Sequence, residues 1–223
     1  MTSTGALTDR RGLWAFIVGV VAVAVGVVVH VQMFLMAGGM GYRMVGMPID
    51  NAMIVAMALT VAGIGIAAYG LLPRKVAAEW DSSRIVVSPP EDAPLSWQHW
   101  RLMTVLFVAL IIDVMKPASL GFTIPGMIDE YGASKATVSL VPFFALVGTV
   151  VGSVAWGAIA DIYGRKASIL LSAVMFVGTS VCGAMPSLAW NIGMCFMMGA
   201  AAGGMLPVTY ALLAEMMPSK HRG

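Results

Sequence analysis

Charge is what this sequence has least of: only 11% of its 223 residues are Asp, Glu, Lys or Arg, whereas 59% are hydrophobic. A soluble domain carries about 25% charged residues, so this composition excludes an ordinary soluble protein. The net charge of +2 is too small to argue for a nucleic-acid partner, and no basic patch or stacking platform stands beside it. The apolar runs are far longer than barrel strands, which predicts an all-α integral membrane protein.

Cysteines and catalytic motifs are also scarce. The two cysteines, Cys182 and Cys195, lie inside apolar runs, where neither spacing nor surroundings suggest a disulfide or a metal site. We expect both thiols to pack in the interior as small hydrophobic groups. The sequence contains no Ser/His/Asp set, no phosphate-cradling glycine loop and no HExxH motif. We therefore expect no enzymatic activity and no cofactor.

Methionine, by contrast, is abundant, with 19 residues. Soft side chains cluster near the end of the first apolar run: His30, Met33, Met36, Met40, Met44 and Met47. Thioethers and an imidazole could together hold Cu(I). Such a cluster is more often adaptable apolar packing. We favour packing, so no metal site is predicted.

Six apolar segments account for most of the chain. Each is long enough to cross a bilayer as a helix, in which the backbone hydrogen bonds close within the segment. The first segment is longer than a signal-peptide core and ends in no convincing cleavage site, so we expect it to be retained. The predicted segments cover residues 13–36, 52–72, 102–124, 136–160, 168–185 and 191–214.

A polar stretch rich in charge and proline separates the first two segments from the last four. Its composition predicts a solvated linker over residues 73–100. The end of the stretch, from Trp97 to Arg101, is typical of an interfacial anchor. The sequence therefore predicts a two-helix hairpin over residues 1–72, a cytoplasmic linker, and a four-helix unit over residues 101–223.

The basic residues are distributed unequally between the two ends of the predicted helices. Arg43 and Lys135 fall on one side of the membrane, and ten Lys and Arg fall on the other. These ten are Arg10, Arg11, Arg74, Lys75, Arg84, Arg101, Arg165, Lys166, Lys220 and Arg222. Positive charge accumulates on the cytoplasmic side. We therefore expect a multi-pass protein of the cell membrane, specifically a bacterial inner membrane, with both termini in the cytoplasm.

A short basic turn joins the fourth and fifth segments and reads Gly157-Ala-Ile-Ala-Asp161-Ile-Tyr-Gly164-Arg165-Lys166. We expect the two glycines to remove side chains where backbones approach. Asp161 is expected to cap the following helix or to pair with one of the two cations, which anchor the turn on the cytoplasmic side. An ordinary Asp-capped basic turn would explain the same residues without any gating role.

The spacing of this turn resembles the signature of the major facilitator superfamily, which lies between that family's second and third helices. A stretch of the sixth segment adds to the resemblance. Gly199 and Gly203 form a small-xxx-small face for close packing, and Gly204, Pro207 and Tyr210 follow them. This stretch is similar to the fourth helix of the family's sugar-porter and metabolite:proton symporter branches.

The resemblance continues into the loop after the sixth segment, where Glu215 belongs to a Glu-x-x-Pro run and Arg222 to an Arg-Gly pair. It implies that these two residues join Asp161 and Arg165 in a cytoplasmic charge network that closes the inner gate. One departure limits the analogy. Those branches often carry an arginine at the start of this helix where the present chain has Cys195, so no coupling role is carried over to that position.

Two ionisable residues lie inside the third segment. Asp113 and Lys116 are three residues apart and therefore share a helix face. Each charge at mid-membrane costs about 2.5–3.5 kcal/mol, so both are expected to face protein or water. Pro117 is expected to loosen or kink the helix. We favour a site for proton coupling or substrate contact; the alternative is a self-compensating pair without a role.

From residue 97 onward the chain resembles four consecutive helices of a family whose fold has two six-helix halves that rock about a central site. The resemblance implies proton-coupled symport or antiport of a small organic solute, with this chain as an N-terminal portion that is inactive alone. The alternative is an accessory or structural subunit of a larger membrane complex. The predicted partners are the bilayer, the solute and a proton, together with missing transporter helices or a membrane-complex subunit.

Overall fold

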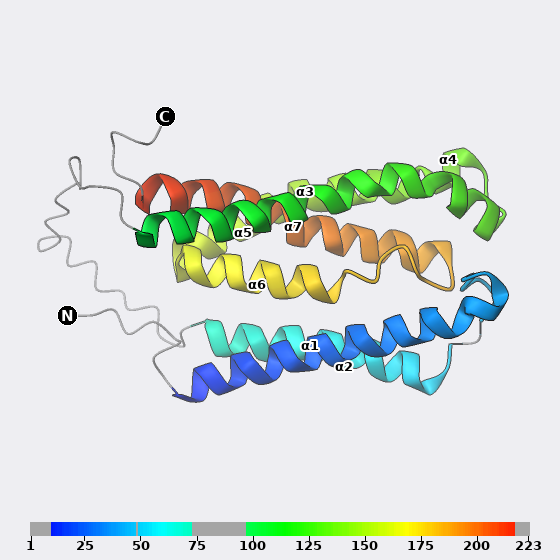
Figure 1. Ribbon diagram of the computed structural model, residues 1–223, viewed down its shortest axis with the longest axis horizontal. Helices are drawn as coiled ribbons and strands as arrows, with labels where there is room; N and C mark the ends of the chain where they lie inside the picture. Colours follow the sequence, from blue (N-terminus) through cyan, green and yellow to red (C-terminus); the bar gives the residue numbers. More distant parts are fainter. Residues whose placement is uncertain (1–9, 48, 73–96, 217–223) are drawn as a thin grey trace, which may run out of the picture.

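The computed structural model describes residues 10–47, 49–72 and 97–216, and over these residues the chain forms helices and no strand. The helices are α1 (Arg10–Met36), η2 (Ala37–Met40), α2 (Asn51–Leu71), α3 (Trp97–Tyr131), α4 (Lys135–Val138), α5 (Leu140–Tyr163), α6 (Arg165–Gly178) and α7 (Leu188–Met216). The long helices run side by side along one axis (Figure 1). The predicted all-α fold class is confirmed.

Five helical stretches among the described residues are long and apolar enough to cross a membrane. They are Arg10–Met40, Asn51–Leu71, Trp97–Tyr131, Lys135–Tyr163 and Leu188–Ala214. Each overlaps one of the predicted segments almost completely, with ends that differ by up to seven residues. Side-chain caps define two of the boundaries: Asp50 accepts a 2.8 Å hydrogen bond from the backbone of Met53 at the start of α2, and Ser134 accepts one from Thr137 at the start of α4. The protein is a multi-pass, all-α membrane protein.

The fifth predicted segment, residues 168–185, differs most from the structure. Helix α6 has only 14 residues and ends at Gly178. It therefore rises about 21 Å, less than the hydrocarbon thickness of about 30 Å. Residues 179–187 continue without regular helix. The expectation of one continuous helix to residue 185 is wrong, because hydropathy reports an apolar segment and not its backbone conformation.

Side chains from neighbouring helices satisfy the backbone of this non-helical segment. The Asn191 side chain accepts a 2.5 Å hydrogen bond from the backbone N–H of Gly183, and the Tyr131 hydroxyl donates one of 2.6 Å to the carbonyl of Met185. Gly183 has a φ of 100°, which favours glycine. Irregular backbone at membrane depth is tolerated where it is buried in protein. Tertiary contacts therefore supply part of the hydrogen bonding of this segment, and local turn bonds such as that from Cys182 N–H to the Thr179 carbonyl supply more.

Helix α3 extends beyond the predicted segment at both ends. Trp97 begins its first turn, so the predicted interfacial anchor is part of the helix. The helix continues through position 117, so the proline there does not end it. Residues 73–96, which make up most of the predicted linker, lie outside the described residues.

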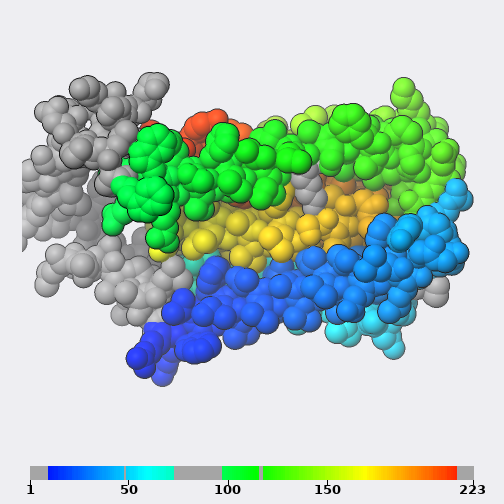
Figure 2. Space-filling model, in the orientation of Figure 1, coloured from blue at the N-terminus to red at the C-terminus, as the bar shows by residue number. Residues whose placement is uncertain are grey.

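The α1–α2 hairpin is held together by glycine contacts and packs against α6. A Cβ at Gly63 would lie 2.8 Å from the carbonyl oxygen of Gly19, and one at Gly70 would lie 2.5 Å from the backbone nitrogen of Phe16. Figure 2 shows α1 (blue) lying along α6 (yellow), with α3 (green) on the other side of α6. One buried cluster joins the hairpin to α5 and α6, and it comprises Val23, Ala67, Leu71, Trp156, Leu171 and Val174.

The long helices alternate in direction, so their termini gather at two ends of the bundle (Figure 1). One end holds the start of α1, the end of α2, the start of α3, the α5–α6 turn and the end of α7. Arg10, Arg11, Arg101, Arg165 and Lys166 belong to these termini. At the opposite end, Arg43 lies in the loop before α2 and Lys135 begins α4.

Candidate functional site

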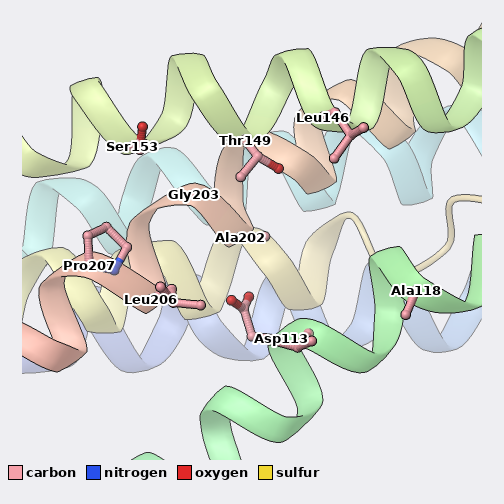
Figure 3. Close-up of a pocket in the computed structure, with 10 residues that line it drawn as sticks. Asp113, Ala118, Leu146, Thr149, Ser153, Ala202, Gly203, Leu206 and Pro207 are labelled. Carbon is pink, nitrogen blue, oxygen red and sulfur yellow. The ribbon is translucent and has the colours of Figure 1, made fainter.

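A pocket of about 630 Å³ lies between α3, α5 and α7 (Figure 3). Among the described residues that line it, none comes from the hairpin or α6. These lining residues are Asp113, Val114, Ala118, Leu146, Thr149, Ser153, Ala202, Gly203, Leu206 and Pro207. A volume in this range is typical of sites for small organic ligands. We call it the Asp113 pocket.

Asp113 is the one ionisable residue among those lining residues whose side chains the structure describes. Its side chain is 4% exposed, and its Oδ1 has no hydrogen-bond partner among the described residues. Figure 3 shows the carboxylate directed from α3 toward α7. A buried polar atom without a partner is unfavourable, so this oxygen is suited to bind a proton or a ligand. Lys116 follows on the same helix, but its side chain lies outside what the structure describes.

Small residues bring α7 against α5 at the base of the pocket. A Cβ on Gly199 would overlap the carbonyl oxygen of Ala145, and one on Gly203 would overlap that of Thr149. Gly204 lies beneath the indole of Trp156, whose Nε1 donates a 2.8 Å hydrogen bond to Ala200. Small residues in a membrane helix allow this backbone-to-backbone packing.

Pro207 modifies the hydrogen bonding of α7 beside the pocket. It lies inside the helix and has no N–H to donate to the carbonyl of Gly203, four residues earlier. Both residues line the pocket. The carbonyl of Gly203 therefore lacks its usual helical donor in the wall of the pocket that Asp113 also lines.

Two hydroxyl residues that the sequence analysis did not single out also line the pocket. Thr149 and Ser153 donate their hydroxyl hydrogens to the carbonyls of Ala145 and Val150, at 3.0 and 2.8 Å. Their oxygens keep lone pairs that can accept hydrogen bonds. The signal was present in the sequence, because two hydroxyl residues four apart in an apolar run share a helix face.

The basic turn has a different local structure from the one expected. Asp161 lies in the last turn of α5, and the N-cap of α6 is Gly164, which has no side-chain cap. Asp161 therefore does not cap the following helix. Gly164 has a φ of 92°, which explains a glycine there by backbone conformation. Gly157 has open space where a Cβ would lie, so close approach among the described residues does not account for it.

The predicted charge network is only partly within the described residues. Arg165 begins α6, Lys166 follows it, and α7 extends through Glu215 to Met216, so these backbones share the end of the bundle that carries the turn. The side chain of Glu215 and the whole of Arg222 lie outside the described residues. The network stays a prediction.

Neither Cys182 nor Cys195 forms a disulfide, and the two side chains are half-buried and buried, respectively. Cys195 is fully buried, and the thiol of Cys182 lies 3.2 Å from the sulfur of Met198. The methionine cluster of the first segment does not converge on one point, because Met36 is 77% and Met40 is 55% exposed whereas Met44 is buried. His30 is buried away from those two, and its surroundings are described below.

Three known transporters are similar to part of this chain in sequence. The niacin transporter NiaP of Acinetobacter baylyi is 26% identical over 139 residues, which cover 62% of this chain and 32% of that protein. The 4-hydroxybenzoate transporter PcaK of the same species is 30% identical over 132 residues, covering 59% and 29%. The gallate transporter of Pseudomonas putida is 27% identical over 149 residues, covering 61% and 33%. The chain thus spans about a third of the length of the curated relatives it matches.

No solved structure matches the chain. The sequence profile of the Major Facilitator Superfamily matches residues 102–223, which is more than half of the chain and includes the described residues that line the Asp113 pocket. The chain belongs to the major facilitator superfamily.

Proposed function

We propose that this chain contributes the Asp113 pocket to a proton-coupled transporter of small aromatic carboxylic acids. The observation that carries the proposal is the buried carboxylate of Asp113, which has an oxygen without a partner among the described residues and lines a pocket of about 630 Å³.

The lining of the pocket fits an aromatic acid. Val114, Leu146 and Leu206 offer apolar surface to a ring, while Thr149 and Ser153 offer hydrogen-bond acceptors to ring substituents. The relatives are named as transporters of niacin, 4-hydroxybenzoate and gallate, which are all aromatic carboxylic acids.

Proton coupling follows from the charges that meet in the pocket. An ionised Asp113 would repel the carboxylate of the solute, because like charges in a desolvated site interact strongly. A protonated Asp113 instead donates a hydrogen bond to that carboxylate. The solute therefore binds with a proton, and both cross the membrane when the pocket changes sides. This order of events is symport.

For the pocket to open alternately to the two sides of the membrane, further helices must cover its exposed edge at Leu206 and Pro207. In this family a second six-helix half rocks against the first. In our proposal the basic turn closes the inner gate through Asp161, Arg165, Glu215 and Arg222. Residues 1–223 reconstituted alone in liposomes are accordingly expected to show no saturable, gradient-driven uptake.

The experiment that tests the proposal is uptake of labelled 4-hydroxybenzoate and nicotinate by the protein together with the helices that complete it. Asp113→Asn should abolish accumulation driven by a pH gradient while retaining exchange of internal for external solute. Asp129→Asn is the matched control, because Asp129 is an exposed carboxylate of the same helix. Full proton-driven uptake by Asp113→Asn would show that the coupling residue lies elsewhere.

The alternative of a merely tolerated charge pair has its own test. If Lys116 only compensates Asp113, the double variant Asp113→Asn/Lys116→Met should insert and transport like the parent. If Asp113 carries the proton, the double variant should lose driven uptake as the single variant does.

The membrane orientation is also part of the proposal. We infer that the end with the basic turn faces the cytoplasm of a bacterial inner membrane, because most Lys and Arg gather there. In a background without Cys182 and Cys195, a cysteine replacing Lys166 should react only from the cytoplasmic side, and one replacing Lys135 only from outside. Labelling of position 166 from outside would reverse the assignment.

A further inference from the structure

A second, smaller cavity lies between the hairpin and the transporter helices. It has a volume of about 60 Å³ and is lined by residues of α1, α2, α7, the end of α6 and the non-helical segment 179–187. Four of the lining side chains bear on its chemistry: His30, Met57, Met185 and Met194. Small-molecule sites are typically several times larger. The cavity has room for a single ion, and we call it the His30 cavity.

The burial and hydrogen bonding of the His30 imidazole are those expected of a histidine that binds a metal ion. The side chain is 3% exposed, and the backbone of Ala184 hydrogen-bonds the ring. Its Nε2 is buried and has no hydrogen-bond partner among the described residues. In metal sites the second ring nitrogen is commonly held by a backbone carbonyl or a carboxylate, which fixes the ring and leaves the other nitrogen free to coordinate.

The three methionines reach the cavity from three different parts of the chain. Met57 belongs to α2, Met194 to α7, and Met185 to the non-helical segment between α6 and α7. Met185 is held in place, because its carbonyl accepts a 2.6 Å hydrogen bond from the hydroxyl of Tyr131. A continuous helix through this segment would have different neighbours at position 185. The non-helical conformation of residues 179–187 therefore helps to place Met185 at the cavity.

The donor set selects the type of metal. Thioethers are soft ligands that favour Cu(I), and imidazole also suits copper. Zinc and the hard cations prefer thiolates, carboxylates or several imidazoles. Among the described residues no group of three or more His, Cys, Asp or Glu could hold such an ion.

We propose that His30 Nε2, Met57, Met185 and Met194 bind one Cu(I) ion, which pins the α1–α2 hairpin to the transporter helices. This set differs from the methionine cluster of the sequence analysis, with which it shares only His30. The proposal does not depend on the proposed transport function, since no lining residue is common to the two cavities.

The test is metal binding by the purified chain in detergent. Ag(I) serves as a soft, redox-stable probe, and Cu(I) is titrated without oxygen against a chromogenic chelator. One ion per chain is expected. His30→Ala and Met57→Leu should each lower the affinity by at least about 10- to 100-fold, because loss of a group that only supports a metal ligand already has an effect of this size. The double variant Met36→Leu/Met40→Leu, which changes two exposed methionines, should bind as the parent does.

Several outcomes would overturn the proposal. The first is a parent chain that binds neither ion, and the second is a His30→Ala variant that binds both ions unchanged. If His30→Ala fails to fold, the nearly isosteric Met57→Leu and Met185→Leu variants decide the question, with the thermal unfolding midpoint as the folding check. X-ray absorption of the Cu(I) form should show sulfur and nitrogen scatterers together. A spectrum with only nitrogen or oxygen would place the ion elsewhere.

Discussion

The Asp113 pocket and the His30 cavity are both lined in part by α7 and share one physical feature, with different consequences. Each contains a buried polar side chain with an atom that has no partner among the described residues. The first is about 630 Å³ and opens beside exposed Leu206 and Pro207, whereas the second is about 60 Å³ and is lined by thioethers. An unsatisfied polar atom marks a place for a ligand, and the volume and the neighbouring donors indicate which kind of ligand fits.

Packing around the two sites also differs. Beside the Asp113 pocket, α7 lies against α5 through Gly199 and Gly203. Around the His30 cavity the hairpin meets α6 at Gly178, where a Cβ would lie 2.9 Å from the methyl group of Thr60. The first contact is between backbones and cannot relax, whereas the second involves the end of a side chain that can shift.

The largest expected effect is on proton-driven uptake, and it distinguishes the Asp113 pocket from the His30 cavity. Asp113→Asn should lower proton-driven uptake by about 100-fold or more, the scale of losing a positioned proton carrier. It should leave Ag(I) affinity unchanged. His30→Ala should show the converse, with metal affinity lost and uptake retained. Measuring both properties in both variants tests whether the sites are independent, and loss of uptake in both variants would mean that they are coupled.

The next effect tests the rigidity of the α5–α7 contact. Gly199→Ala should destabilise the chain by about 1–3 kcal/mol, because the new methyl group overlaps the backbone of α5. Gly157→Ala is the matched control within helix α5. There the Cβ meets open space, so the change should stabilise the helix by about 0.5–1 kcal/mol. Thermal unfolding in detergent measures both changes, and equal effects would contradict the described packing.

The smallest effect concerns the polar contacts that hold the non-helical segment. Tyr131→Phe removes the hydroxyl that donates to Met185 and accepts a 3.1 Å hydrogen bond from Asn191. Loss of such a hydrogen bond should lower the free energy of unfolding by about 1 kcal/mol. If the same energy is lost from metal binding, the Ag(I) affinity should fall about fivefold. Uptake through the Asp113 pocket should not change. Unchanged Ag(I) affinity would show that Tyr131 does not help to position Met185.

The sequence was sufficient to predict five of the membrane-spanning helices and to single out Asp113 as a candidate site residue. Apolar runs of spanning length form helices because each must satisfy its backbone within itself in lipid. A lone carboxylate in such a run stands out because of its cost. Thr149 and Ser153 were harder to recognise, since hydroxyl residues are tolerated on any face of a membrane helix, and only the packing of α3 against α5 and α7 shows that they line the pocket.

Side-chain identity alone did not reveal which methionines share a site with His30. Met33, Met36 and Met40 are neighbours of His30 in the sequence, yet Met36 and Met40 are largely exposed. Met57, Met185 and Met194 are far away in the sequence and line its cavity. Sequence proximity within one helix places residues around its whole circumference, whereas a cavity collects residues from the facing sides of several helices.

The amino-acid sequence by itself determined the spanning helices, the unequal distribution of basic charge between their two ends, and the presence of a carboxylate within the membrane. These follow from local solvation, because each segment is matched to lipid or water independently of the others. Tertiary structure alone decided that the helix after Arg165 stops at Gly178, that Asp113 faces a pocket shared by α3, α5 and α7, and that soft side chains surround His30. The reason is that each of these features depends on hydrogen bonds and close contacts supplied by residues distant in the chain.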